Sequence, residues 1–168
     1  MEENTRKFDS EIKISSENKW YYRESEIVLD KVLDFFKENL NEDELGIYIF
    51  NQYKQFSEKG YLECEGIPLR ILNLEENNEL LYFYSENLKK FSILESNFYF
   101  DPSGSLFVIP KDQKLLKYRF SRDTLQYLSR YLIQDGENYY LEFRNSKIPI
   151  LEFRDSFLVK VPEFNQNN

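Results

Sequence analysis

The stretch WYYRESEIVLDKVLDFFKENL, residues 20–40, decides the fold, because the spacing of its apolar residues changes within it. Aromatic residues dominate Lys19–Arg23, which is typical of a β-strand. From Ser25 onward the apolar residues recur every three or four positions, which predicts an amphipathic helix. We expect Ser25 to cap the start of this helix, and the helix to end near residues 39–41.

The rest of the chain is read as short strands separated by turn-forming stretches, with one further helix. The turn Asp101–Gly104 is expected to join two of these strands. The second helix is expected from Ser121 or Asp123 to Ile133, and aromatic strands follow it. Helices that cover mainly antiparallel strands predict the α+β class.

The two helix entries indicate an internal repeat. Tyr22–Ser25 aligns with Tyr118–Ser121, so that each helix follows an aromatic strand and a serine. Without a gap, the alignment pairs apolar residues of the two helices: Leu29 with Leu125, Val32 with Leu128, and Phe36 with Leu132. Gly66–Leu69 also recurs as Lys147–Ile150. Any amphipathic helix has such spacing, so chance is the competing explanation, but the matching flanks favour duplication.

We therefore predict two related strand–helix–strands units with mainly antiparallel sheets, each covered by one helix. The expected bounds are residues 11–95 for the first unit and 96–163 for the second. The polar ends, residues 1–10 and 164–168, are expected to be disordered.

Charge and hydropathy argue against nucleic acid and membranes as partners. The 22 Lys and Arg against 30 Asp and Glu give a net charge of −8, which repels a phosphate backbone. The apolar runs are far shorter than the ~20 residues that cross a bilayer. Because the N-terminus lacks the apolar segment of a secretory signal, we expect a cytoplasmic protein.

Several catalytic chemistries lack the residues that they need. The chain has no histidine and one cysteine, Cys64, which excludes histidine-based nucleophile pairs and thiolate zinc sites. Glycine-rich nucleotide motifs are also missing, and no metal or cofactor is expected. Carboxylates are the remaining groups that could act in catalysis. Glu63 and Glu65 should share one face of a strand, and Glu42–Glu44 form the densest acidic cluster, but exposed sheet and loop surfaces have the same pattern.

The candidate binding residues are Arg119, Ser121 and Arg122, at the start of the second expected helix. Arginine beside a helix N-terminus can bind an anion such as a phosphate or a carboxylate. Pairing with neighbouring acids is the alternative reading.

The order of these features resembles the bacterial domain-of-unknown-function family 1285. The resemblance is carried by Asn18–Tyr22, by Gly46–Tyr48 followed by Leu62–Leu69, and later by Gly104–Leu106 and Arg119–Arg122. It covers about residues 12–150, and the helix entry after Tyr22 departs from the family by lacking its Pro-Arg element. The resemblance implies two small α+β units with a repeated motif, no established enzymatic activity, and a suggested role in signalling through binding.

These observations favour a non-catalytic intracellular binding module, regulatory or signalling in role, that engages a protein or a small ligand. The alternative is a carboxylate-dependent hydrolase or transferase with an acid pair in a cleft. The missing histidine and the missing nucleotide and metal motifs favour the module over the enzyme.

Overall fold

The computed structural model describes residues 4–164, which form two compact units. The first unit combines Met1–Pro68 with Ser156–Asn168, and the second is Leu69–Asp155. This division differs from the expected boundary between residues 95 and 96. The reason is pairing: the strand that begins at Leu69 joins the second sheet, and Val159 returns to bridge Cys64 of the first unit.

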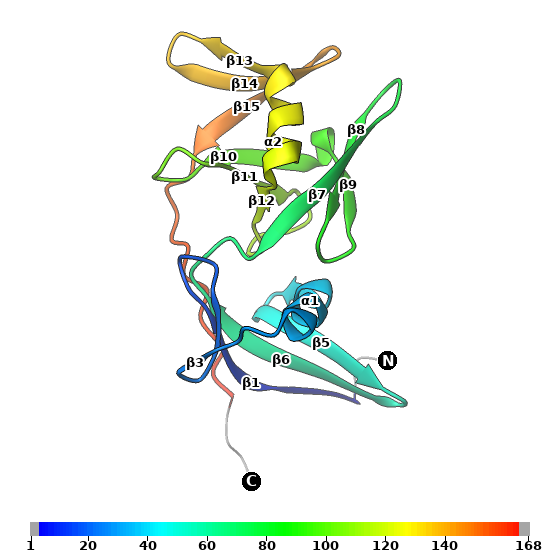
Figure 1. Cartoon of the computed structure of the whole chain (residues 1–168), viewed down its shortest axis with the longest axis vertical. Helices are drawn as coiled ribbons and strands as arrows, with labels where there is room; N and C mark the ends of the chain where they lie inside the picture. The colour runs from blue at the N-terminus through cyan, green and yellow to red at the C-terminus, as the bar shows by residue number, and fades with distance from the viewer. Residues whose placement is uncertain (1–3, 165–168) are drawn as a thin grey trace. The chain divides into compact units, whose positions relative to one another are not determined.

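The first unit is one mixed sheet with one helix (Figure 1). Its elements are β1 Thr5–Ile14, β2 Trp20–Tyr22, β3 Ser25–Glu26, α1 Asp30–Glu38, β4 Leu40–Asp43, β5 Gly46–Tyr53 and β6 Phe56–Cys64. The strand order is β3-β2-β1-β6-β5-β4. The central neighbours β1 and β6 are parallel, and the other neighbouring pairs are antiparallel.

The first helix begins later than the apolar spacing predicts. Ser25 and Glu26 pair with β2 as strand β3, so Ser25 is not the helix cap. Leu29 occupies the N-cap position without a side-chain hydrogen bond. The helix packs lightly, since none of its residues is buried, and the Phe36 ring stacks on the buried Trp20 with 6.0 Å between centroids.

The expectation of a disordered N-terminus is wrong for the part of it that the structure describes. Residues 5–9 pair in parallel with β6, from Thr5 opposite Ser57 to Asp9 opposite Tyr61. Strand pairing supplies the order that the polar composition does not predict. Residues 1–3 of that segment, and residues 165–168 of the expected disordered tail, lie outside the described residues.

The second unit is a larger mixed sheet with α2 beside it (Figure 1). Its elements are β7 Leu69–Glu76, β8 Leu81–Ser85, β9 Lys90–Ser92, the 3-10 helix η2 Ile93–Glu95, β10 Ser96–Phe100, β11 Leu106–Pro110, β12 Tyr118–Phe120, α2 Arg122–Leu128, the 3-10 helix η3 Ser129–Tyr131, β13 Leu132–Asp135, β14 Asn138–Phe143 and β15 Ser146–Glu152. The strand order is β13-β14-β15-β10-β11-β12-β7-β8-β9, with β10–β15 and β12–β7 parallel.

The second helix begins where expected and ends early. Ser121 caps it by accepting a hydrogen bond from the Thr124 backbone N–H. The helix ends at Leu128 rather than near Ile133, because Leu132–Asp135 pair with β14. As at Ser25, residues that the apolar spacing assigns to a helix pair in a sheet instead.

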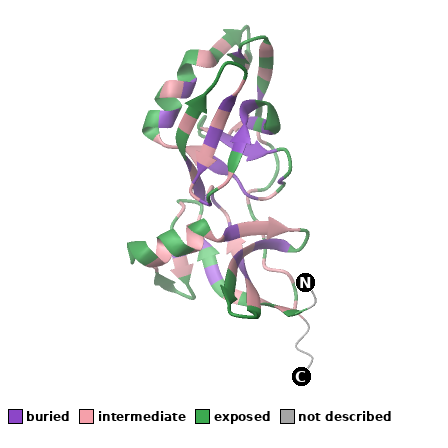
Figure 2. Ribbon diagram, turned by 90° about the vertical axis from the view of Figure 1, so that its right-hand side faces the viewer, coloured by how far each residue is buried: buried purple, intermediate pink, exposed green. Residues whose placement is uncertain are grey.

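Aromatic side chains fill the core of the second unit. The fully buried Phe83 ring contacts Phe91, Phe98 and Phe120, with centroids 5.6, 5.9 and 5.8 Å away. Figure 2 shows buried segments along the strands of this unit. The chain is thus an α+β protein with more strand than helix among residues 4–164. Within this described part, no helix has the length and apolar character needed to span a bilayer.

Candidate functional site

A pocket of about 540 Å³ lies in the second unit, between α2 and the sheet. Strands β10, β11, β12 and β14 contribute its floor, and α2, η3 and the start of β13 form one wall. The lining residues are Phe100, Gly104, Ser105, Leu106, Arg119, Phe120, Leu125, Leu128, Ser129, Leu132 and Leu141. Most of this lining is leucine and phenylalanine, so the pocket is an apolar one.

The predicted turn between β10 and β11 shapes one end of the pocket. Asp101 holds it, since its Oδ1 accepts hydrogen bonds from the backbone N–H groups of Ser103 and Ser105 at 2.9 and 2.8 Å. Gly104 has a φ of +83°, a conformation that glycine adopts without steric cost. The turn brings Leu106 opposite Phe100 in the sheet.

Leucines of two kinds line the pocket. Leu128 and Leu141 are buried and fix the helix on the sheet. Leu125 and Leu132 are each 42% exposed, although both lie in the apolar lining. The wall therefore presents apolar surface that this chain leaves partly open to solvent.

Arg119 is the one charged residue in the lining, but its side chain belongs to the opposite face of the sheet. Successive strand residues point to opposite faces, and its neighbours Tyr118 and Phe120 pack into the aromatic core. The pKa of Arg119 is lowered by burial first and by the nearby Arg70 second, while Glu86 opposes the shift. Its guanidinium is thus placed among residues of that other face.

The three predicted binding residues lie at the end of β12 and the start of α2. The Ser121 hydroxyl oxygen accepts the capping hydrogen bond of α2. Arg122 is exposed at the first position of that helix, while Arg119 is partly buried in β12. The three residues are close in sequence, but the structure gives each a different environment.

Three of the carboxylates singled out in the sequence, those of Glu63, Glu65 and Asp43, are engaged in ion pairs. Lys13 contacts Glu63 at 2.9 Å and Glu65 at 3.5 Å. Asp43 of the acidic cluster accepts hydrogen bonds from Lys59 at 2.9 Å and from the Tyr61 hydroxyl at 2.7 Å. Among the residues that the structure describes, no group of acids, cysteine or histidine could hold a metal ion.

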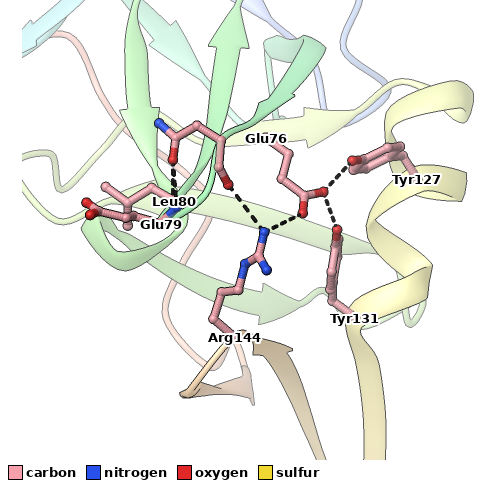
Figure 3. A network of polar contacts seen from close by, with 7 residues as sticks. Glu76, Glu79, Leu80, Tyr127, Tyr131 and Arg144 are labelled. Atoms are coloured by element: carbon pink, nitrogen blue, oxygen red, sulfur yellow. Dashed lines mark hydrogen bonds and ion pairs between the residues drawn. The ribbon is translucent and has the colours of Figure 1, made fainter.

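A polar cluster that the sequence pattern did not indicate is centred on Glu76, at the end of β7 (Figure 3). The hydroxyls of Tyr127 and Tyr131 donate to its Oε2 at 2.7 and 2.6 Å, and Arg144 donates to its Oε1 at 3.3 Å. The cluster joins β7 to α2, η3 and the β14–β15 turn. Glu76 lies more than 50 residues from each partner, so no local pattern could have indicated it.

Replacing Glu76 with glutamine is expected to lower the thermal midpoint at neutral pH, with a difference that shrinks in acid. The hydrogen bonds from Tyr131 and Tyr127 hold the pKa of Glu76 below its ordinary 4.5. A depressed folded-state pKa gives stability that is present above the unfolded pKa and is lost as pH falls through the folded one. Thermal unfolding of both proteins between pH 7 and about pH 3 measures this.

The matched control is Glu79→Gln, which changes an exposed acid in the same turn. It should leave the midpoint unchanged at every pH. If Glu76→Gln lowered the thermal midpoint equally at neutral and at acidic pH, the ionised carboxylate of Glu76 would not be the source of the stability.

Comparison with known proteins identifies the fold. No protein-family model matches the sequence, and no curated protein matches it. Among solved structures, the chain is similar to a DUF1285 family protein from Silicibacter pomeroyi DSS-3, with 16% identity and a TM-score of 0.60 over 87% of this chain and 82% of that one. A DUF1285 family protein from Shewanella baltica OS155 is similar with 14% identity and a TM-score of 0.47, over 71% of this chain and 90% of that one. The predicted resemblance to this family is confirmed at the level of the fold by the first of these structures.

Proposed function

We propose that this protein is a non-catalytic binding module that holds a small, mainly apolar ligand in the pocket beneath α2. The observation that carries the proposal is the pocket itself: its volume of about 540 Å³ falls within the range of small-molecule sites. The partly exposed Leu125 and Leu132 on its wall would gain burial from an apolar ligand.

The lining argues for binding rather than turnover. It contains no carboxylate, thiol or imidazole that could act as acid, base or nucleophile on a ligand. Its two hydroxyls contact other protein groups, Ser129 with the Gln126 carbonyl and Ser105 with Ser103. A wall of this kind holds a ligand without changing it, which suits an intracellular regulatory or signalling role.

We also propose that the two units descend from one duplicated motif. The order β12-β11-β10-β15-β14-β13 in the second sheet parallels β3-β2-β1-β6-β5-β4 in the first, with a parallel central pair in both. Three element starts, Asp30 and Arg122, Leu40 and Leu132, and Gly46 and Asn138, are each 92 positions apart. Strands β7–β9 have no counterpart among the described residues of the first unit, which explains why the second sheet is larger.

The binding proposal is tested with N-phenyl-1-naphthylamine, a neutral apolar molecule that fluoresces more strongly in apolar surroundings. We expect the wild-type protein to bind it saturably at one site. Leu125→Gln combined with Leu132→Gln should weaken binding about tenfold or more, because polar groups replace apolar wall.

The control is Leu94→Gln, since Leu94 is exposed to a similar extent, 44%, and lies outside the pocket lining. This variant should bind as the wild type does. Equal weakening by both changes, or no saturable binding by the wild type, would refute the proposal. Saturable binding lost only in the double variant supports it.

A further inference from the structure

Two arginines lie side by side on the face of the second sheet opposite the aromatic core. Arg70 of β7 and Arg119 of β12 are register partners in a parallel pair. Their strand neighbours Leu69, Ile71 and Tyr118 are fully buried, so by strand alternation both guanidinium groups leave the sheet on the other side. Two like charges are thus held on adjacent strands.

One carboxylate, that of Glu86, serves Arg70. Its Oε1 accepts hydrogen bonds from Arg70 Nε and Nη2 at 3.0 and 2.8 Å, and its Oε2 accepts one from the Arg70 backbone N–H at 2.8 Å. The side chain of Glu86 is only 8% exposed. This geometry fixes the guanidinium of Arg70 and leaves its Nη1 group without a hydrogen bond to residues 4–164.

Glu86 makes no hydrogen bond to Arg119 and acts on it through its charge alone, which opposes the lowering of the Arg119 pKa. The guanidinium of Arg119 makes no hydrogen bond or ion pair within the described part of the chain, although the residue is partly buried and Arg70 is its neighbour. Burial and repulsion from Arg70 outweigh the attraction of Glu86, since the pKa of Arg119 is lowered, and both make its charge unfavourable. An anion between the two guanidinium groups would offset both the burial of the Arg119 charge and its repulsion from Arg70.

We infer that Arg119 and the Nη1 edge of Arg70 form a binding site for an oxyanion, a phosphate or carboxylate group. The planar guanidinium offers paired N–H donors that match the spacing of oxygens in both groups. Glu86 acts as a positioning residue, because its hydrogen bonds to Arg70 hold that side chain in place. The site lies on the opposite face from the apolar pocket and does not depend on the proposed function.

The test follows the arginine Nε–H signals of the whole ¹⁵N-labelled chain during titration with inorganic phosphate, and separately with acetate, against chloride at matched ionic strength. We expect saturable shifts of the Arg119 signal with phosphate or acetate, and the lower saturating concentration identifies the preferred group. Arg119→Gln should weaken binding about tenfold or more. A response no larger than that to chloride would overturn the inference.

The exposed Arg122 supplies the matched variant, since Arg122→Gln removes a nearby cation of the same type. It should leave anion affinity unchanged, and a loss equal to that of Arg119→Gln would reduce the effect to general charge attraction. Thermal unfolding is the second readout. The anion should raise the wild-type midpoint in proportion to its occupancy, and should raise that of folded Arg119→Gln much less. Equal increases in both proteins would also overturn the site.

Discussion

Replacing Phe83 with alanine is expected to destabilise the second unit by ~3–5 kcal/mol, the usual cost of removing a fully buried phenyl ring. The ring is 0% exposed and lies at the centre of contacts with Phe91, Phe98 and Phe120, which come from three other strands. Alanine would leave a cavity that these rings cannot close without leaving their own contacts. Urea unfolding followed by far-ultraviolet circular dichroism measures the change.

Tyr82→Ala is the control for this prediction, because Tyr82 precedes Phe83 in β8 and points to the other face of the sheet. Tyr82 is partly exposed, and its ring lies 4.3 Å from the Lys90 ammonium. Its replacement should cost clearly less than the replacement of Phe83. Similar losses from both changes would show that the ring cluster is not the centre of the core.

Helix positions were harder to predict than helix existence, and the reason is local. Ser25 and Ser121 look equivalent in sequence, since each follows an aromatic strand and precedes an apolar periodicity. Ser121 caps α2, whereas Ser25 pairs with β2. Residues that follow a strand can fold back and pair with it or begin a helix, and Ser25 pairs with Tyr22, three positions earlier.

The proposed repeat illustrates the same difficulty in register. The ungapped alignment that starts from Tyr22 and Tyr118 pairs Phe36 with Leu132, yet Phe36 lies in α1 and Leu132 in β13. The recurring Ile-Pro pair is not equivalent either, because Pro68 precedes β7 and Pro149 lies inside β15. Composition and periodicity indicated two similar helix-containing parts, while the spacing of 92 residues follows only from the observed strands.

The sites also depended on long-range pairing. Arg119 was singled out for its place beside a helix, but its neighbour Arg70 comes from a strand 49 positions earlier that lies next to β12 only in the folded sheet. The pocket gathers leucines of the second expected helix, Leu125, Leu128 and Leu132, with Leu106 and Leu141 from strands that are distant in sequence. Apolar spacing predicts which helix residues face a sheet, but it does not show where the side chains between helix and sheet leave a cavity.

Replacing Gly66 with alanine is expected to destabilise the first unit by ~1–3 kcal/mol or more, because the site has no room for a methyl group. A Cβ there would lie 2.5 Å from the Ser15 carbonyl oxygen and closer still to Oδ1 of Asn18. That Oδ1 accepts a hydrogen bond from the Ile67 backbone N–H at 2.6 Å. The turn between β1 and β2 must therefore shift, and the hydrogen bond must lengthen or break.

Trp20 provides the measurement, because this single tryptophan of the chain is only 3% exposed and follows that turn directly. Its fluorescence during urea unfolding should show a lower midpoint for Gly66→Ala. Asn18→Ala removes one of the two obstacles together with the hydrogen bond to Ile67. The double variant should therefore lose less stability than the sum of the two single losses. Both single changes disturb the same contact between position 66 and Asn18, so their costs should overlap in the double variant. Additive losses would mean that the methyl group at position 66 disturbs some other part of the unit.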